Sequence, residues 1–299
     1  MRVRILGTAA GGGVPQWNCA CPGCAAARAD PRLRRRHASI AVEDGTGRWY
    51  VVNATPDIGE QIEAYAELRP GPGHRETPLA GVILTDAELD HTLGLMRLRE
   101  AKGLNVIATT TVHRALDEGL RLGHTLSPYT GIARSDLPTD KPLVLGEGHL
   151  EVQGIPVSNK RPRYAAALDL EDEGWVVALR LTDRRSGTIL VYAPALAAWP
   201  PELDEALAGA DCVFLDGTFW DDEEPRRAGF SQKTATGMGH LPIAGPGGTA
   251  DRLGALPAAR RLYTHLNNSN PLVLPGHDGH RDLARRGIEI AQEGAVIEL

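Results

Sequence analysis

Leu84-Thr85-Asp86-Ala87-Glu88-Leu89-Asp90-His91-Thr92-Leu93-Gly94-Leu95 is the stretch around which this chain is organised. Apolar residues before it predict a short buried strand, and apolar residues after it follow a helical period. Between them lie four side chains that can bind a metal, namely Asp86, Glu88, Asp90 and His91. A strand followed by a loop of such ligands is a common frame for a metal site. The competing interpretation is that Asp90 caps the helix and His91 lies in its first turn.

Length and composition favour one domain with a large aliphatic core. The chain has 299 residues, of which 42% are hydrophobic but only 5% aromatic. The net charge of −6 argues against a nucleic-acid partner. No apolar run is long enough to cross a membrane, so we expect no membrane association. Residues 1–7 resemble the start of a strand and not a signal peptide, which predicts a cytoplasmic protein.

The order of elements predicts an α/β sandwich with sheets inside and helices outside, over a single domain of residues 1–299. Strands are predicted at 3–6, 38–43, 48–53, 81–84, 105–108, 150–157, 176–181, 188–193, 212–215 and 260–264. Helices are predicted within 58–68, 111–120 and 201–208. Residues 123–142 show no clear period, and we interpret them as a lid or a substrate-facing insertion.

The loop at 17–25 is predicted to bind a structural zinc ion. Cys19, Cys21 and Cys24 form a C-x-C-x-x-C motif, and Pro22-Gly23 supplies a turn that wraps the chain around an ion. In a reducing compartment, cysteines this crowded indicate metal binding more than disulfides. Zinc would need one further ligand from elsewhere.

Several metal-competent residues recur at the ends of predicted strands. Asp90-His91, Asp216 and His265 each follow an apolar run, and His240 ends the long polar segment 221–239. Each has an ordinary structural interpretation when taken singly; Asp216-Gly217, for example, is a plausible turn. If the strands share a sheet, however, these ends gather at one edge. Two imidazoles with one or two carboxylates form a typical site for a single Fe²⁺, Mn²⁺ or Zn²⁺.

These motifs resemble those of the metallo-β-lactamase superfamily. Asp86-x-Glu88-x-Asp90-His91 occupies the place of the H-x-H-x-D-H motif of that superfamily. Asp216 in Leu215-Asp216-Gly217-Thr218 matches its bridging aspartate, and His265 matches its last histidine. The resemblance implies an αββα sandwich, in which two mixed sheets pack together with helices outside.

More narrowly, the chain resembles a family of that superfamily that acts in the biosynthesis of pyrroloquinoline quinone (PQQ). The matching stretches run from end to end of the chain: 6–19, 53–58, 84–86, 90–92, 216–218, 238–240 and 265–271. Two stretches, 36–40 and 160–173, differ from the family pattern.

The departures from the wider superfamily imply one catalytic metal where relatives hold two. Asp86, Glu88 and Ser158-Asn159 stand where the dinuclear hydrolases have three histidines for one metal. The resemblance leaves one catalytic Fe(II) with the second ligand set: Asp90, His91, Asp216 and His265. Whether Asp90 or Asp216 is the main carboxylate stays open. Two histidines and a carboxylate with open positions are the ligands of non-haem Fe(II) oxygenases.

The family resemblance implies Fe(II)- and O₂-dependent hydroxylation of the tyrosine ring of a cross-linked Glu–Tyr intermediate cut from a peptide. His240 is expected to move protons, while Asp86 and Glu88 are expected to bind the amino group of the substrate. Asn268 stands where phosphodiesterase relatives place a histidine that completes the cysteine site, so it is the candidate fourth zinc ligand. A homodimer is compatible with this interpretation.

Two other functions fit the same residues. A zinc hydrolase is compatible with the ligand set, because one Zn²⁺ can activate water. A non-catalytic carrier of PQQ or of an intermediate would keep the pocket without metal turnover. The mass of the product after aerobic reconstitution with iron separates the three functions.

Overall fold

The computed structural model, which describes residues 1–170 and 173–299, has two mixed sheets of seven strands each at its centre. In spatial order the first sheet contains β14 (Val296–Glu298), β1 (Arg2–Gly7), β2 (Ser39–Glu43), β3 (Trp49–Val52), β4 (Leu79–Ile83), β5 (Leu104–Ala108) and β6 (Ile132–Asp136). The second contains β13 (Glu289–Ile290), β12 (Arg260–Thr264), β11 (Cys212–Asp216), β10 (Ile189–Ala193), β9 (Val176–Asp183), β8 (Leu150–Ser158) and β7 (Leu143–Leu145).

The two sheets pack face to face through alternating aliphatic side chains. In β2, Ile40 and Val42 point into the core between the sheets, whereas Ala41 belongs to the outer cluster under α2 (Ile58–Ala64). Successive residues of a strand face opposite sides of the sheet, which explains this division. Tyr192 and Phe214 supply two of the few aromatic rings in the inner core. Each fully buried side chain of this kind contributes about 1.5–3 kcal/mol.

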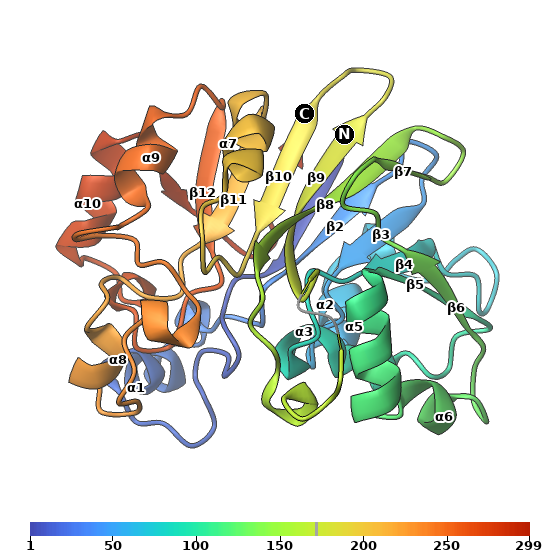
Figure 1. Ribbon diagram of the computed structural model, residues 1–299, viewed down its shortest axis with the longest axis horizontal. Helices are drawn as coiled ribbons and strands as arrows, with labels where there is room; N and C mark the ends of the chain where they lie inside the picture. The colour runs from blue at the N-terminus through green and yellow to red at the C-terminus, as the bar shows by residue number, and fades with distance from the viewer. Residues whose placement is uncertain (171–172) are drawn as a thin grey trace.

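Helices cover the outer faces of the sandwich (Figure 1). The helices of the described residues are α1 (Pro22–Ala29), α3 (Leu89–Thr92), α4 (Gly94–Arg97), α5 (Thr110–Arg114), α6 (Leu122–Leu126), α7 (Pro201–Ala208), α8 (Glu224–Arg227), α9 (Ala250–Ala255) and α10 (Asp278–Arg285), together with α2. Figure 1 shows α7, α9 and α10 on the side of β12, and α2, α5 and α6 on the side of the first sheet. The predicted αββα sandwich is therefore confirmed. Within the described residues, no helix is long and apolar enough to span a membrane.

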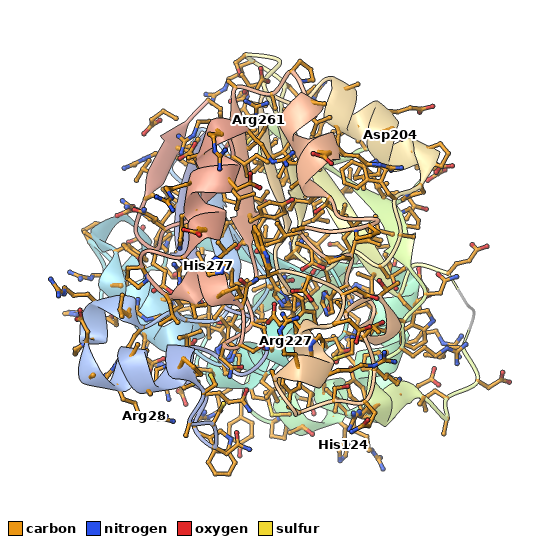
Figure 2. The ribbon with its side chains drawn as sticks, turned by 90° about the vertical axis from the view of Figure 1, so that its left-hand side faces the viewer. Arg28, His124, Asp204, Arg227, Arg261 and His277 are labelled. Carbon is orange, nitrogen blue, oxygen red and sulfur yellow. The ribbon has the colours of Figure 1, made fainter. Side chains whose placement is uncertain are left out.

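The two ends of the sandwich differ in what they carry. Figure 1 shows both chain termini at the upper end, while α1, α3 and α8 lie at the lower end. Figure 2, turned by 90°, shows Arg28 of α1 and Arg227 of α8 toward the lower end and Arg261 and Asp204 toward the upper end. The parallel strands β4, β11 and β12 each lead into a loop that carries candidate site residues.

The segment 123–142 is part of the sandwich and is neither a lid nor a substrate-facing insertion. It contains most of α6 and the whole of β6, and β6 pairs in parallel with β5 as the last strand of the first sheet. Its sequence lacks a clear period because an edge strand is covered on fewer sides and therefore needs fewer apolar residues. The short strands β7, β13 and β14, of two or three residues, also escaped prediction. Residues 171–172 of the divergent stretch 160–173 lie outside the described part of the chain.

Candidate metal centre

The candidate site is assembled where strands from both sheets end. After β4 the chain continues through Asp86 and enters α3, which contains Asp90 and His91. In the second sheet, β11 ends at Asp216 and lies in parallel register with β12, so that Asp216 is level with Thr264. His265 follows immediately. Since parallel strands end at one edge of a sheet, residues distant in sequence meet there.

Asp90, His91 and His265 converge closely enough to share one metal ion. One ligand atom from each lies within 4.8 Å of the others. The Oδ2 atom of Asp90 lies 3.4 Å from Nε2 of His265 and 3.7 Å from Nε2 of His91, although Asp90 and His265 are 175 residues apart. Three such ligands with positions left open are typical of a catalytic metal site.

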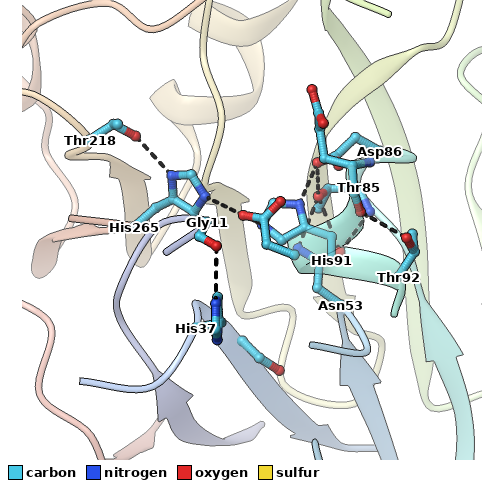
Figure 3. A network of polar contacts seen from close by, with 12 residues as sticks. Gly11, His37, Asn53, Thr85, Asp86, His91, Thr92, Thr218 and His265 are labelled. Atoms are coloured by element: carbon cyan, nitrogen blue, oxygen red, sulfur yellow. Dashed lines mark hydrogen bonds and ion pairs between the residues drawn. The ribbon is translucent and has the colours of Figure 1, made fainter. Parts of the chain in front are cut away.

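Asp86 fixes the orientation of His91. The Nδ1 atom of His91 donates to Oδ2 of Asp86 at 2.7 Å, and the buried Nε2 atom has no hydrogen-bond partner among the described residues (Figure 3). Metal-bound histidines usually donate their other N–H to a carboxylate in this way. An unpartnered buried nitrogen that faces a carboxylate fits a metal ligand, because leaving it unbonded costs free energy.

The structure places Asp86 differently from the expected contact with a substrate amino group. Its Oδ2 accepts hydrogen bonds from His91 and from Thr85 Oγ1, the latter at 2.7 Å. Its Oδ1 accepts the backbone N–H of Glu88 at 2.9 Å, and the side chain is almost completely buried. Asp86 therefore supports a candidate metal ligand. Glu88 has the freer carboxylate, which lies 3.4 Å from Lys160 Nζ and lines the cavity.

Asn53 is a supporting residue to which the sequence motifs gave no role. Its amide oxygen accepts the backbone N–H of Thr85, and its amide nitrogen donates to Thr85 Oγ1, both at 3.0 Å. The backbone of Asn53 has a φ of 67°, a left-handed conformation that asparagine tolerates better than most residues. The available sequence signal was an Asn at the end of the predicted strand 48–53, within the matching stretch 53–58. The chain of contacts runs from Asn53 through Thr85 and Asp86 to His91 (Figure 3).

Thr218 selects the tautomer of His265. A carboxylate can only accept, so Thr218 Oγ1 donates its proton to Asp216 Oδ1 at 2.6 Å. The same oxygen then accepts Nδ1–H of His265 at 2.8 Å, which leaves a lone pair on Nε2 facing Asp90. His265 has a φ of 59°, a strained conformation that persists only where its surroundings enforce it.

Asp216 is already saturated by hydrogen bonds. Oδ1 accepts the N–H and Oγ1–H of Thr218, and Oδ2 accepts the N–H of Leu196 at 2.8 Å and Nδ1–H of His240 at 2.7 Å. Asp216, His240 and His265 also form a group of close ligand atoms. Because all four acceptor positions of Asp216 are occupied, its geometry suits holding His240 better than ligating a metal. Of the two candidate carboxylates, Asp90 faces the free imidazole nitrogens.

Burial and neighbouring charges shift the pKa values of the cluster residues in opposite directions. Burial alone would lower the pKa of His91, but the charges of Asp86 and Asp90 outweigh it and raise this pKa to about 9. Burial lowers the pKa of His265, although the negative charge of Asp90 opposes this shift. Burial would raise the pKa of Asp90, yet His91 and His265 hold it far below its usual range. A metal must therefore displace a proton from His91, which makes its binding pH-dependent.

A small cavity of about 240 Å³ lies against these residues. One wall is apolar and contains Phe219, whose ring stacks on Phe230 at 6.2 Å and meets the ring of His240 edge-on at 5.9 Å. With Nδ1 of His240 held by Asp216, Nε2 is the atom left to meet a ligand. A flat apolar wall beside an imidazole suits a planar ring.

Two other cavities have different surroundings. One of about 820 Å³ adjoins the small cavity and shares Glu88, Asp90 and Ser158 with it. Ser158 therefore lies at the cavity. Another of about 940 Å³ lies among the starts of β4 and β5 and contains none of the candidate ligands.

The three cysteines form a second, separate group of ligand atoms. The sulfur atoms of Cys19, Cys21 and Cys24 lie within 4.8 Å of one another. The Nδ2 atom of Asn268 lies 3.2 Å from Cys19 Sγ, and the backbone oxygen of Asn268 lies 3.3 Å from Cys21 Sγ. Burial opposes ionisation of Cys21, but hydrogen bonds from Cys24, Asn268 and Cys19 lower its pKa.

This group fits tetrahedral zinc. Three sulfurs are in place, and Asn268 offers the fourth ligand through its backbone oxygen or through its amide oxygen after a flip of the side chain. Gly23 permits the close approach, since a Cβ atom there would lie 2.5 Å from the oxygen of Asn268. The structure thus brings together all four residues predicted for this site.

Comparison with known proteins agrees with this architecture. Residues 48–266 match the family described as Beta-lactamase superfamily domain. The chain is 39% identical to coenzyme PQQ synthesis protein B of Azoarcus sp. (strain BH72) and of Pseudomonas fluorescens (strain SBW25), each over all of both chains. It is therefore a metallo-β-lactamase-fold protein. Within that superfamily, it belongs to the family of coenzyme PQQ synthesis protein B.

Solved structures extend the likeness. The crystal structure of Zn²⁺-bound PqqB from Methylobacterium extorquens is 33% identical to this chain and superposes with a TM-score of 0.89. The superposition covers 100% of both chains. The crystal structure of a diphosphatase from the PhnP family has a TM-score of 0.71 at 18% sequence identity. That superposition covers 100% of this chain and 97% of the diphosphatase chain. The second likeness shows the shared fold alone.

Proposed function

We propose that this protein acts in PQQ biosynthesis as an Fe(II)- and O₂-dependent hydroxylase of the tyrosine ring of a peptide-derived, cross-linked Glu–Tyr intermediate. The observation that carries the proposal is the cluster of Asp90, His91 and His265, in which one carboxylate faces two free imidazole nitrogens. This ligand set with open positions is the one used by non-haem Fe(II) oxygenases. The names of the full-length relatives support the pathway.

The residues beside the cluster support a single catalytic metal. Asp86 is engaged by His91, Glu88 lies near Lys160, and Ser158 offers a hydroxyl and no imidazole. They provide no second set of imidazole ligands, so the two-metal clamp of hydrolytic relatives is missing. Fe(II) held by Asp90, His91 and His265 would supply the activation of O₂.

The remaining residues of the site bind and orient the substrate. The phenol ring lies against Phe219, which brings its hydroxyl to His240 Nε2. His240 takes up or returns the phenol proton, and Asp216 stabilises the imidazolium form through Nδ1–H. Glu88 meets the amino group of the substrate at the mouth of the cavity. A reductant from solution supplies the two electrons that convert the second oxygen atom of O₂ to water.

Aerobic reconstitution tests the proposal. The purified protein is loaded with Fe(II) and given the intermediate, ascorbate and ¹⁸O₂, with the Zn(II)-loaded protein as the control. We expect ¹⁸O in the product of the iron form only. A cleaved ester or amide bond in both forms would identify a zinc hydrolase, and bound but unchanged intermediate would identify a carrier. Metal analysis of the loaded protein should give one Zn²⁺ and one further metal per chain.

The variant His240→Ala tests the division of roles inside the site. It should retain iron but lose rate by roughly 10²–10⁴-fold, the usual contribution of a positioned proton-transfer group. Iron content and single-turnover product under O₂ are measured beside His265→Ala. If both variants lose iron equally, His240 is a ligand and the assignment is wrong.

A further inference from the structure

The outer cavity next to the metal centre has a positive lining in an acidic protein. The chain has a net charge of −6, yet Lys160, Arg161, Arg163 and Lys233 all line this cavity of about 820 Å³. The described lining residues include two carboxylates, Glu88 and Asp90. Asp90 belongs to the candidate metal cluster, so it does not balance this charge.

Two of the four cations already have protein partners. The guanidinium of Arg161 donates to the backbone oxygens of Leu168 and Leu170 at 3.0 and 2.8 Å and lies over the ring of Trp175. Lys160 pairs with Glu88 at 3.4 Å. Arg161 therefore supports the loop, and Lys160 is paired with Glu88.

Arg163 and Lys233 differ from these two. Within residues 1–170 and 173–299, no carboxylate lies within ion-pair distance of either side chain. The two residues reach the cavity from separate segments, one after β8 and the other before His240. Both are exposed, so their charges face the solvent that fills the cavity.

The backbone under both cations is held in place. Beside Arg163, the hydroxyl of Tyr164 donates to the backbone oxygen of Ala87 at 2.7 Å, which ties this segment to the loop that carries the metal ligands. Near Lys233, the N–H groups of Ala235 and Thr236 donate to the backbone and side chain of Asp222 at 2.9 and 2.8 Å. A fixed backbone reduces the conformational entropy that is lost when these side chains bind an anion.

We propose that Arg163 and Lys233 form an anion clamp that binds the carboxylate groups of the substrate outside the ring cavity. This inference rests on the proposed function, because it assumes that an aromatic ring occupies the small cavity beside Phe219. The ligand class is an aromatic amino-acid derivative with carboxylates beyond its ring. Arg163 offers a planar fork to one carboxylate, and Lys233 offers a point charge to another. The clamp determines specificity and takes no part in the chemistry.

Binding to the Zn(II)-loaded, full-length protein tests the clamp without turnover. The probes are γ-glutamyltyrosine, which has a phenol and two carboxylates, and p-cresol, which has the same ring and no charge. Affinities are measured by titration calorimetry for the wild type, Arg163→Gln, Lys233→Gln and the double variant. Lys141→Gln is the matched control, because it removes an exposed positive charge outside the cavity lining.

We expect each single variant to bind γ-glutamyltyrosine about tenfold more weakly, the usual loss for one hydrogen bond to a charged group. The double variant should lose on the order of 10²-fold, and its affinity should depend less on salt. Binding of p-cresol to all variants, and binding of both probes to Lys141→Gln, should change less than about twofold.

Two results would overturn the clamp. One is an unchanged affinity of the double variant for γ-glutamyltyrosine, and the other is an equal loss for p-cresol. Failure of the proposed function looks different. In that case the iron-loaded wild type incorporates no ¹⁸O, while the preference for γ-glutamyltyrosine and its dependence on Arg163 and Lys233 persist.

Discussion

The cysteine loop and the Asp90–His91–His265 cluster are both candidate metal sites, but they are built in different ways. The three sulfurs come from six consecutive residues, and their partners are backbone N–H groups and Asn268. The second cluster joins residues 175 positions apart. There, each imidazole is aligned by a second side chain, His91 by Asp86 and His265 by Thr218.

This difference indicates different tasks. A closed tetrahedral set of thiolates stabilises a fold, whereas oriented ligands with open positions suit catalysis. The two regions are nevertheless linked, because Asn268 lies three residues after His265 on the same loop. The cysteine loop can therefore hold the segment that carries a catalytic ligand without taking part in the reaction.

His265→Ala should produce the largest effect and should separate the two regions. Removal of this imidazole leaves Asp90 and His91 alone, so we expect complete loss of iron and of product. The cysteine site should keep its zinc, because its ligands are untouched. Inductively coupled plasma mass spectrometry of the reconstituted variant measures both metals. Loss of zinc and iron together would show that the two sites are not independent.

Cys21→Ser should have the opposite pattern. It should lower the zinc content and reduce the free energy of unfolding by about 3 kcal/mol, since structural zinc contributes directly to folding. Iron bound at Asp90 should remain. Chemical denaturation and metal analysis check this, with Cys212→Ala as the control for a buried cysteine outside the cluster. Unchanged zinc in Cys21→Ser would refute the assignment.

Asp86→Asn tests whether an aligning side chain matters at the imidazole site. The amide can turn a donor toward His91 Nδ1, which disfavours the tautomer that leaves Nε2 free. We expect metal affinity at this site to fall by about 10–100-fold, as for other residues that orient metal ligands. Competition with a chelator measures the affinity. Glu88→Gln is the matched control, and an equal loss in that variant would show a general effect of charge.

Substitution of Glu224 should have the smallest effect. Glu224 contacts Ser269 in the loop that carries both His265 and Asn268. Its carboxylate accepts the N–H of Trp220 and the hydroxyl of Ser269, each at 2.6 Å, and burial raises its pKa from 4.5 to about 7. Between these values the folded protein binds a proton that the unfolded chain has released. Stability contributed by this proton is therefore complete below about pH 4.5 and is lost as the pH rises to 7.

Glu224→Gln should remove this decline, which amounts to roughly 1–3 kcal/mol. Urea denaturation at pH 5 and pH 8 measures the change, and the exposed neighbour in Glu223→Gln is the control. Metal content should stay the same in both variants. A decline of the same size in Glu224→Gln would assign the pH dependence to another group.

Features that depend on neighbouring residues could be predicted from the sequence. Short apolar runs located most of the strands, and the fold class followed from their order. The C-x-C-x-x-C motif and the Asp90-His91 pair were also visible, because their ligands lie close together in the chain. Their binding of metal remains a prediction.

Only the tertiary structure decided how distant polar groups pair. The sequence left Asp90 and Asp216 as equal candidates, and the N–H of Leu196 and the side chains of Thr218 and His240 occupy Asp216. It likewise could not show that Asp86 faces His91. The number of donors around a buried carboxylate depends on which segments pack against it, and no local pattern encodes that packing.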